Sequence, residues 1–226
     1  IEFFDHKIDS LNVYDLKLLE NREWEKNTIR HWNIGESDAL KIMDNFFSNG
    51  IQDYTDGRNF PIKKNVSRLS PYLHWGQISP NTLWYEVDNY KKDVSGNNID
   101  IFKSELGWRE FFYNLMYHFP IIQKFNLQKK FDKFPWENNT KLLKIWRNGL
   151  TGYPIVDAGM RELYETGWMH NRIRMVVGSF LVKHLRINWT EGEKHFRNCL
   201  LDFNKANNIA QWQWVAGCGA DAAPYF

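Results

Sequence analysis

Apolar residues recur at helical spacings along most of the chain, and no stretch alternates convincingly with a period of two. The segment IFKSELGWREFFYNLMYHF carries Leu106, Phe112 and Leu115 at such spacings, after a possible N-cap at Asp100 and before Pro120. This pattern predicts one long helix. Because the other apolar segments have the same character, we predict an all-α fold.

Cap and turn residues predict several further helices. Ser79 followed by Pro80 is typical of a helix start, Gly149 and Gly167 are typical of helix ends, and Thr190 with Glu193 would form a capping box. The predicted segments are 81–87, 141–149, 156–167, 169–187 and 191–202. The first fifty residues resemble connecting helical structure, with no internal repeat or low-complexity linker.

The segment MHNRIRMVVGSFLVKHLRI places polar groups on an otherwise apolar helix. Asn171, Arg174, Met175 and Gly178 share one stripe at i, i+3, i+4 and i+7. A buried Arg needs a partner, because an unpaired charge in an apolar interior is costly. Either the Arg side chain reaches solvent, or the stripe faces inward, with Arg174 paired to an acid such as Asp202 beside a bound planar ligand.

Composition limits the class of protein further. Of the 226 residues, 43% are hydrophobic, yet no apolar run has transmembrane length, which predicts a soluble protein. Charges interrupt IEFFDHKIDS, so nothing there indicates a secretory signal, and we expect a cytoplasmic protein whose two cysteines are free thiols. The formal net charge is only +2, so any polyanion site would be a local patch. Aromatic residues reach 16%, which suits a large core or a stacking surface.

Common catalytic motifs are absent from the sequence: it has no glycine-rich phosphate loop, C-x-x-C, H-E-x-x-H or nucleophile elbow, and no metal site is predicted. Two weaker patterns could bind a ligand. The hydroxyls of Ser67 and Ser70 in NVSRLSPYL could hold a diphosphate, or could simply mark a helix start. Glu105, Trp108 and Arg109 share one helical stripe that could grip a flipped base, or could be the exposed edge of an aromatic core helix.

Several sequence segments together resemble those of a known protein family. SRLSPYLHWGQISP, ELGWREFF, TGYPIVDAGMRELYETGWMHNRIRM, SFLVKHLRINWTEGE and WQWVAGCGADAAPYF, in this order, resemble the flavin-binding helical domain of the DNA photolyase and cryptochrome family. The resemblance implies residues 31–226 as a helical FAD-binding domain lacking its C-terminal end. Residues 1–30 would then connect it to an absent α/β antenna domain, whose chromophore is left unassigned.

The resemblance also implies roles for individual residues. In the family, excited reduced FAD passes an electron to a flipped-out pyrimidine dimer. The positions implied to contact FAD are Tyr54, Ser67, Arg68, Leu69, Ser70, Arg109, Asn171, Arg174, Asp202, Asn204 and Asn208, the last of them at flavin N5. The positions implied to contact DNA or the lesion are Glu105, Trp108, Arg109, Asn171, Arg172 and Met175. An electron relay would run through Trp212, Trp189 and Trp136.

Two positions depart from the family pattern. Val66 stands where the family's phosphate motif usually begins with Thr, and Asn204 stands where many members have Asp. The first change removes a hydroxyl from the phosphate motif, and the second removes a charge near the cofactor.

Several functions remain open within the resemblance. Asn171 and Met175 fit repair of cyclobutane pyrimidine dimers better than (6-4) repair, in which His residues face the lesion. We therefore expect a monomeric deoxyribodipyrimidine photo-lyase that uses FAD and acts on damaged DNA. A cryptochrome-type blue-light photoreceptor without repair activity is the alternative. Outside the family, a helical domain that binds single strands by aromatic stacking would carry no yellow chromophore.

Overall fold

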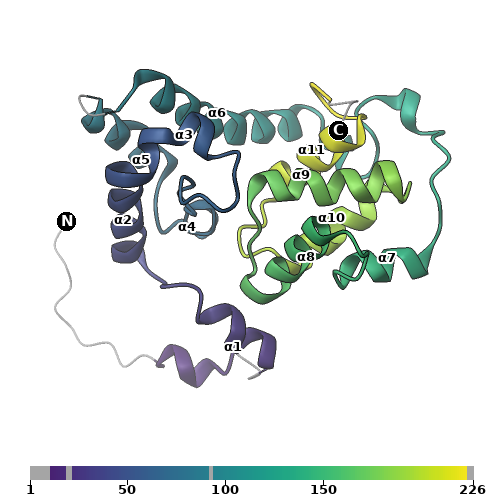
Figure 1. Cartoon of the computed structure of the whole chain (residues 1–226), viewed down its shortest axis with the longest axis horizontal. Coiled ribbons are helices and arrows are strands. Elements are labelled where there is room, and N and C mark those ends of the chain that lie inside the picture. Colours follow the sequence, from purple (N-terminus) through teal and green to yellow (C-terminus); the bar gives the residue numbers. More distant parts are fainter. Residues whose placement is uncertain (1–10, 19–21, 92–93, 223–226) are drawn as a thin grey trace.

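The computed structural model describes residues 11–18, 22–91 and 94–222 and, within them, contains helices and no β-strand (Figure 1). The all-α prediction is therefore confirmed. The α-helices are α1 (Glu23–Ile29), α2 (Glu36–Asn45), α3 (Tyr54–Gly57), α4 (Ser70–His74), α5 (Pro80–Glu86), α6 (Gly96–His118), α7 (Thr140–Arg147), α8 (Pro154–Thr166), α9 (Asn171–Ser179), α10 (Trp189–Cys199) and α11 (Lys205–Ala216).

Shorter helical turns complete the described chain. Five are 3₁₀ turns, at Val13–Leu16, Ile51–Asp53, Val87–Tyr90, Pro120–Gln123 and Lys129–Phe131, and two are π-helical, at Phe46–Gly50 and Phe180–His184. Parts of two predicted segments lie outside the described residues: residues 1–10 and 19–21 of the connecting segment, and residues 223–226 (APYF) at the end of the sequence. In the described part, no helix is long and apolar enough to cross a membrane.

Several predicted helix boundaries are confirmed. The Ser79 hydroxyl accepts a hydrogen bond from Asn81 N at the start of α5. Gly167 ends α8 in the left-handed conformation, with φ of 68°, which glycine adopts without a Cβ clash. Cys199 and Cys218 are free thiols, also as expected.

Two predicted caps are wrong. Helix α6 begins at Gly96 rather than after Asp100, because the buried Asn98 amide binds Thr55 and holds the extra turn in place. Helix α10 is capped by the Asn188 side chain, which accepts from Thr190 N, and no Thr190–Glu193 capping box forms. Glu193 instead turns inward. At the starts of both α6 and α10, tertiary contacts override the local capping signal in the sequence.

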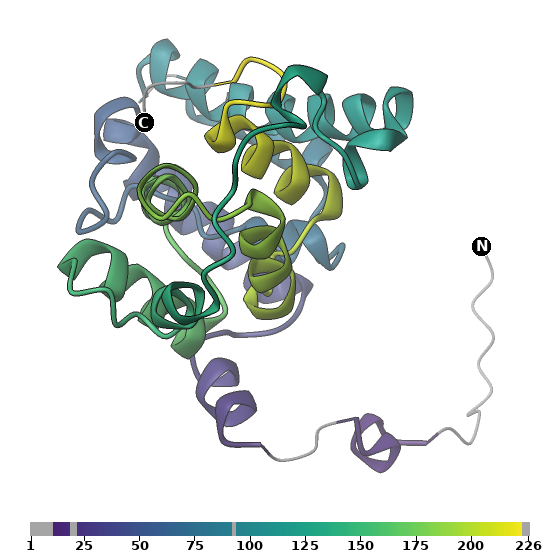
Figure 2. The same cartoon turned by 90° about the vertical axis from the view of Figure 1, so that its right-hand side faces the viewer.

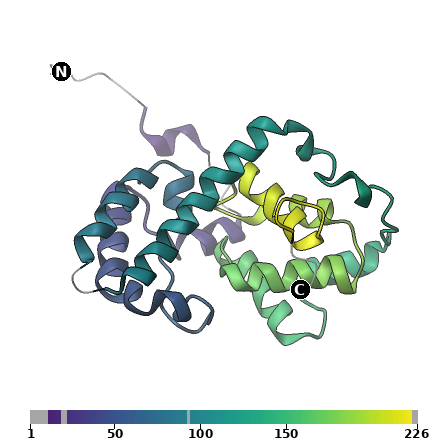
Figure 3. The ribbon, with the colours of Figure 1, turned by 90° about the horizontal axis from the view of Figure 1, so that it is seen from above.

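The described helices pack around two separate clusters of buried side chains. One cluster gathers α2 to α5 with the first part of α6, and the other gathers the end of α6 with α7 to α11. Helix α6 crosses both, contributing Phe102 and Leu106 to the first cluster and Phe112 and Leu115 to the second (Figures 1 and 3). Helix α1 packs on α8 at one side of the molecule (Figures 1 and 2).

A buried amide fixes α11 in the second cluster. Gln213, only 1% exposed, accepts a hydrogen bond from Leu127 N at 2.8 Å and donates to Ile122 O at 2.9 Å and Phe125 O at 3.0 Å. All its polar atoms are thereby satisfied. Gln213 therefore ties the loop after α6 to α11 and holds that helix at the seam between the two clusters.

Candidate cofactor and lesion site

Two adjoining cavities lie between the two clusters. The first, of about 280 Å³, is lined from α6, α9, α10 and α11, and the second, of about 230 Å³, is lined from α3, α4, α5, α6 and α11. Side chains common to both walls are Glu105, Arg174, Asp202, Asn204, Asn207 and Gln211. The shared walls make the cavities two compartments of one site.

An ion pair stands between the two compartments. Arg174 Nη2 lies 2.7 Å from Asp202 Oδ2, and the Asp202 side chain is only 2% exposed. Arg174 Nε donates to Met169 O at 2.8 Å, and the Ser70 hydroxyl donates to Asp202 Oδ2 at 2.6 Å. The inward arrangement of the polar stripe, with Arg174 paired to Asp202, is therefore confirmed. Pairing and hydrogen bonds allow the two charges to sit in this interior position.

The two oxygens of the same carboxylate differ in their hydrogen bonding. Asp202 Oδ1 is buried, and no group in the described residues donates to it. A buried acceptor of this kind costs free energy unless a ligand or water donates to it. Asp202 lines both compartments, so this oxygen offers a hydrogen-bond acceptor to a bound molecule.

The amide of Asn208 has a defined orientation on the first compartment. Asn208 Nδ2 donates to the backbone O and to Oε1 of the buried Glu193, both at 3.2 Å. Glu193 also accepts from Arg197 one turn later on α10. With the amide nitrogen committed to Glu193, the carbonyl Oδ1 remains as the acceptor that Asn208 can offer to a ligand.

The outer wall of the first compartment carries an aromatic ring among cations. Trp108 is 43% exposed and stacks on Phe112 at a centroid distance of 5.9 Å. Beside it, Glu105 pairs with Arg58 at 2.7 Å. Arg58 lies on no predicted helix, and sequence reasoning missed it as a site residue. Burial, followed by the charge of Arg58, lowers the pKa of Arg172.

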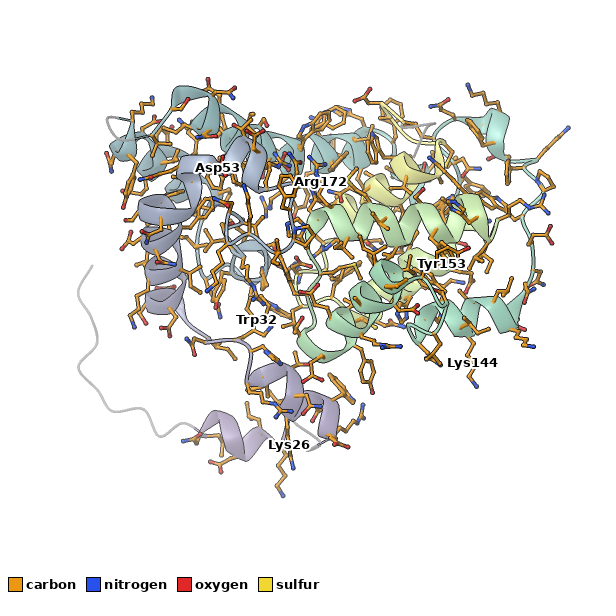
Figure 4. All side chains as sticks on the ribbon, viewed as in Figure 1. Lys26, Trp32, Asp53, Lys144, Tyr153 and Arg172 are labelled. Atoms are coloured by element: carbon orange, nitrogen blue, oxygen red, sulfur yellow. The ribbon has the colours of Figure 1, made fainter. Side chains whose placement is uncertain are left out.

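The first compartment is lined by charges of both signs: the arginines are Arg58, Arg172 and Arg174, and the acids are Glu105, Asp202 and Asp221. Arg172 lies in the middle of the molecule, between the α2–α5 side and the α8–α11 side, and its Nε donates to Asn59 Oδ1 at 2.9 Å (Figure 4). Burial raises the pKa of nearby Tyr54 to about 12, so its phenol stays neutral at ordinary pH. The wall of the first compartment therefore combines cations, acids and an exposed indole.

Most of the expected site residues line these compartments. The first is lined by Glu105, Trp108, Asn171, Arg172, Arg174, Met175, Asp202, Asn204, Asn208 and Trp212. The second is lined by Tyr54, Ser67, Ser70, Glu105, Arg109, Arg174, Asp202 and Asn204.

Four expected site residues lie in neither wall. The Leu69 side chain is buried in the first cluster, so only its backbone could face a cofactor. The Arg68 side chain stacks between Trp32 and Trp168 instead of entering a compartment. Trp136 and Trp189 pack with the second cluster, behind the first compartment.

Trp212 is the expected relay residue that reaches the site. Its ring is buried, lines the first compartment and meets Trp146 edge-on at a centroid distance of 6.2 Å. Trp189 Nε1 donates to Asn126 Oδ1 at 2.9 Å, and the described residues show no ring contact between Trp189 and either Trp212 or Trp136. Trp146, which no cap or motif distinguishes, is therefore the indole in contact with Trp212.

The two departures from the family pattern have different structural settings. Asn204 Oδ1 accepts from Asn207 N at 3.0 Å and caps α11, a role that Asp fills equally well. Its amide nitrogen donates to the Tyr113 hydroxyl, which a carboxylate could not do. Val66 lines neither compartment.

The fold and the cavity walls define an all-helical domain with a divided polar and aromatic pocket. The residues present fit FAD: hydroxyls of Ser67 and Ser70 line one compartment, an indole lines the other, and the unpartnered Asp202 Oδ1 lies between them. Together the compartments have the size and mixed lining of a cofactor site. The sequence matches the family "FAD binding domain of DNA photolyase" over residues 102–226, and the chain belongs to this family.

Similar proteins extend this match beyond residues 102–226. A deoxyribodipyrimidine photo-lyase of Agrobacterium fabrum is 47% identical over 211 residues, which cover 93% of this chain and 44% of that protein. The crystal structure of a class III photolyase from Agrobacterium tumefaciens superposes with a TM-score of 0.91 at 46% identity, covering 96% of this chain and 45% of that one.

A cryptochrome of Synechocystis sp. PCC6803 is also similar. It superposes with a TM-score of 0.79 at 36% identity and covers 86% of this chain and 41% of that chain. The chain thus spans less than half the length of each of these three relatives. Fold similarity alone does not distinguish repair from light sensing, because both kinds of protein share the fold.

Proposed function

We propose that this chain is the cofactor- and lesion-binding part of a light-driven DNA repair enzyme that splits cyclobutane pyrimidine dimers. The observation that carries the proposal is the wall of the first compartment. There Glu105, Trp108, Asn171 and Met175 stand beside the Arg174–Asp202 region and Asn208. Groups suited to two covalently linked, adjacent pyrimidines would then lie next to groups suited to a flavin.

FAD, when bound, would supply the light-excited electron donor. The residues of the chain would bind and orient it. The Ser67 hydroxyl and backbone N–H groups of the Ser67–Ser70 segment would hold the diphosphate side in the second compartment. Asp202 Oδ1 would accept a hydrogen bond from the cofactor. Asn208 Oδ1, oriented by Glu193, would accept a hydrogen bond from a protonated ring nitrogen of the flavin, which favours the reduced state that repair requires.

The lesion would enter from the open side of the first compartment. Trp108 offers an exposed ring for stacking, and the carboxylate of Glu105 is held in place by Arg58 at 2.7 Å. Flipping a dimer out of the duplex costs a few kcal/mol, less than for an undamaged pair, because the dimer stacks poorly. The lower cost of flipping therefore favours binding of the damaged site over intact DNA. Arg58 and Arg172 would attract the DNA phosphates.

Repair and binding can be tested on the same protein. The flavin-loaded protein is illuminated with an oligonucleotide that contains one thymine dimer, and dimer splitting is compared with a dark sample. Trp108→Ala should lose the preference for damaged over intact DNA at a fixed salt concentration. Trp84→Ala is the matched control, since Trp84 is 41% exposed on α5 and lines neither compartment. Splitting that is absent in light, or a preference that survives in Trp108→Ala, would contradict the proposal.

We also infer a tryptophan relay to the cofactor through Trp212, Trp189 and Trp136. Trp212→Phe keeps most of the apolar volume but removes a readily oxidised ring, so photoreduction of bound FAD by an external reductant should slow strongly. Repair by chemically pre-reduced protein should survive. Normal photoreduction in this variant would exclude the relay. The Trp212–Trp146 contact makes Trp146→Phe the informative companion, because it tests whether Trp189 is the next member.

A blue-light photoreceptor is the second candidate, because the Synechocystis cryptochrome superposes with a TM-score of 0.79. It would bind FAD in the same compartments but would not need the Glu105 and Trp108 wall for a lesion. Equal affinity for damaged and intact DNA, together with a normal flavin spectrum and no dimer splitting, would favour this candidate.

A further inference from the structure

Arg68 forms a stacked arrangement outside the cofactor compartments. Its guanidinium carbon lies 4.8 Å from the ring centroid of Trp32 and 4.7 Å from that of Trp168. These three residues come from segments far apart in the sequence: the chain before α2, the connection between α3 and α4, and the connection between α8 and α9. A guanidinium at such distances from two indole faces is attracted by both.

Other contacts fix the two indoles in place. Trp32 Nε1 donates to Thr166 O at 2.7 Å, and the Trp32 ring packs edge-on against Tyr72. Trp32 lies between α1 and α4 (Figure 4). Trp168 is buried in the connection between α8 and α9. The guanidinium therefore lies between the Trp32 ring, which is held by contacts with α8 and α4, and the buried Trp168 ring.

The backbone at Arg68 is in the left-handed region, with φ of 54°. Such a conformation is unfavourable for a residue with a Cβ and persists where neighbouring structure enforces it. Ser67 and Ser70 flank this position, and both line the second compartment. The turn at Arg68 thus directs the guanidinium away from the compartment and leaves its neighbours on the wall.

We propose that Arg68 is a positioning residue: its side chain, clamped by Trp32 and Trp168, holds the Ser67–Ser70 segment in the conformation that binds the diphosphate side of FAD. The identity of the ligand rests on the proposed function. The clamp itself does not, because it concerns the conformation of the segment in the protein without cofactor.

Three substitutions at Arg68 separate the clamp from backbone strain. Arg68→Ala removes the clamp and keeps the strain, Arg68→Gly removes both, and Arg68→Lys keeps a cation between the indoles. We expect the FAD Kd, measured by flavin fluorescence on the cofactor-free protein, to rise roughly tenfold in the Ala and Gly variants, because two cation–π contacts are lost. Arg68→Lys should recover part of the affinity.

Substitution of an indole tests whether Arg68 acts through the clamp. Trp32→Leu should raise the FAD Kd as Arg68→Ala does, although Trp32 lines neither compartment. Lys63→Ala is the matched control, because Lys63 is another exposed cation over a ring, Phe60, in the same connection. The control should leave the Kd unchanged. An unchanged Kd in Trp32→Leu, with a raised Kd in Arg68→Ala, would mean that Arg68 contacts the ligand directly and would overturn the proposal.

Amide hydrogen exchange in the cofactor-free protein gives a readout independent of FAD. Leu69 N donates to the Ser67 hydroxyl at 3.4 Å, and Leu73 N donates to Leu69 O at 2.9 Å. Both amides should exchange faster in Arg68→Ala and Arg68→Gly, while the melting temperature changes little. Unchanged exchange, or parental FAD affinity in Arg68→Gly, would overturn the clamp. Failure of the unmutated protein to bind FAD would overturn the proposed function and leave the exchange result to decide on the clamp.

Discussion

Removal of Arg174 should destabilise the protein even without cofactor. In Arg174→Ala, the Asp202 carboxylate loses the guanidinium at 2.7 Å and keeps the Ser70 hydroxyl as a partner. Its other oxygen is already buried without a donor among the described residues, and Met169 O also loses the Arg174 Nε–H. Breaking a buried ion pair by removing one partner costs about 3 to 5 kcal/mol.

This loss is a large part of the stability of a typical domain, which is about 5 to 15 kcal/mol. Urea unfolding of the cofactor-free protein, followed by far-UV circular dichroism, measures it directly. With a slope of about 3 kcal/mol per molar urea, the midpoint should fall by roughly 1 to 1.7 M. The cofactor must be absent, because a ligand that binds only the folded state would add its own contribution.

Matched variants distinguish a buried pair from an ordinary surface pair. Arg186→Ala removes the ion pair with Glu137, in which both side chains are about half exposed, and should cost under about 1 kcal/mol. The double variant Arg174→Met with Asp202→Leu removes both charges and should recover much of the stability lost in Arg174→Ala. If Arg174→Ala costs no more than Arg186→Ala, the Asp202 carboxylate is effectively solvated, and the reasoning from burial is refuted.

Three further predictions follow from single contacts. Gln213→Leu leaves one buried and two partly buried backbone groups without the amide as partner and should cost about 3 kcal/mol in urea unfolding, whereas an unchanged midpoint would mean that water replaces the amide. Gly192→Ala places a Cβ 2.2 Å from the Trp212 ring, so the ring must move, and unaltered near-UV circular dichroism would contradict this packing. Burial, followed by the charge of Arg147, lowers the pKa of His195 to about 4. The unfolded chain therefore binds a proton first as the pH falls from about 6.5 to 4, and stability should fall over this window by about 2 to 3 kcal/mol, a loss that His195→Gln should abolish.

Much of the fold was predictable because helix periodicity and glycine stops are local signals. Gly167 ends α8 as predicted, and no strand occurs in the described residues. The starts of α6 and α10 were not predictable, because buried side chains from other segments decide them. Asn98 belongs to a network with Thr55 that no local pattern reveals, and Glu193 turns inward to Asn208 and Arg197.

The candidate site was predictable to the extent that physical necessity acts within one helix. An inward-facing Arg174 on an apolar helix would need an acid, and the structure selects this alternative over a solvent-exposed side chain, with Asp202 as the acid. Arg58 was missed because it follows a four-residue helix too short to show periodicity. Arg68 was assigned to the cofactor wall by family resemblance, yet its left-handed backbone turns the side chain outward. Side-chain direction in loops depends on φ and on distant partners, which a sequence pattern does not contain.

The position of the site follows from the way α6 serves two cores. Its apolar residues up to Leu106 belong to one cluster, and those from Phe112 onward belong to the other. Glu105, just before Leu106, and Trp108 and Arg109, between Leu106 and Phe112, line the compartments and belong to neither cluster. Because α6 serves both cores, polar side chains on its middle turns can meet at the seam without entering either core. The aromatic helix therefore holds the two clusters apart at a defined spacing, and the cavities between them are a consequence of that spacing.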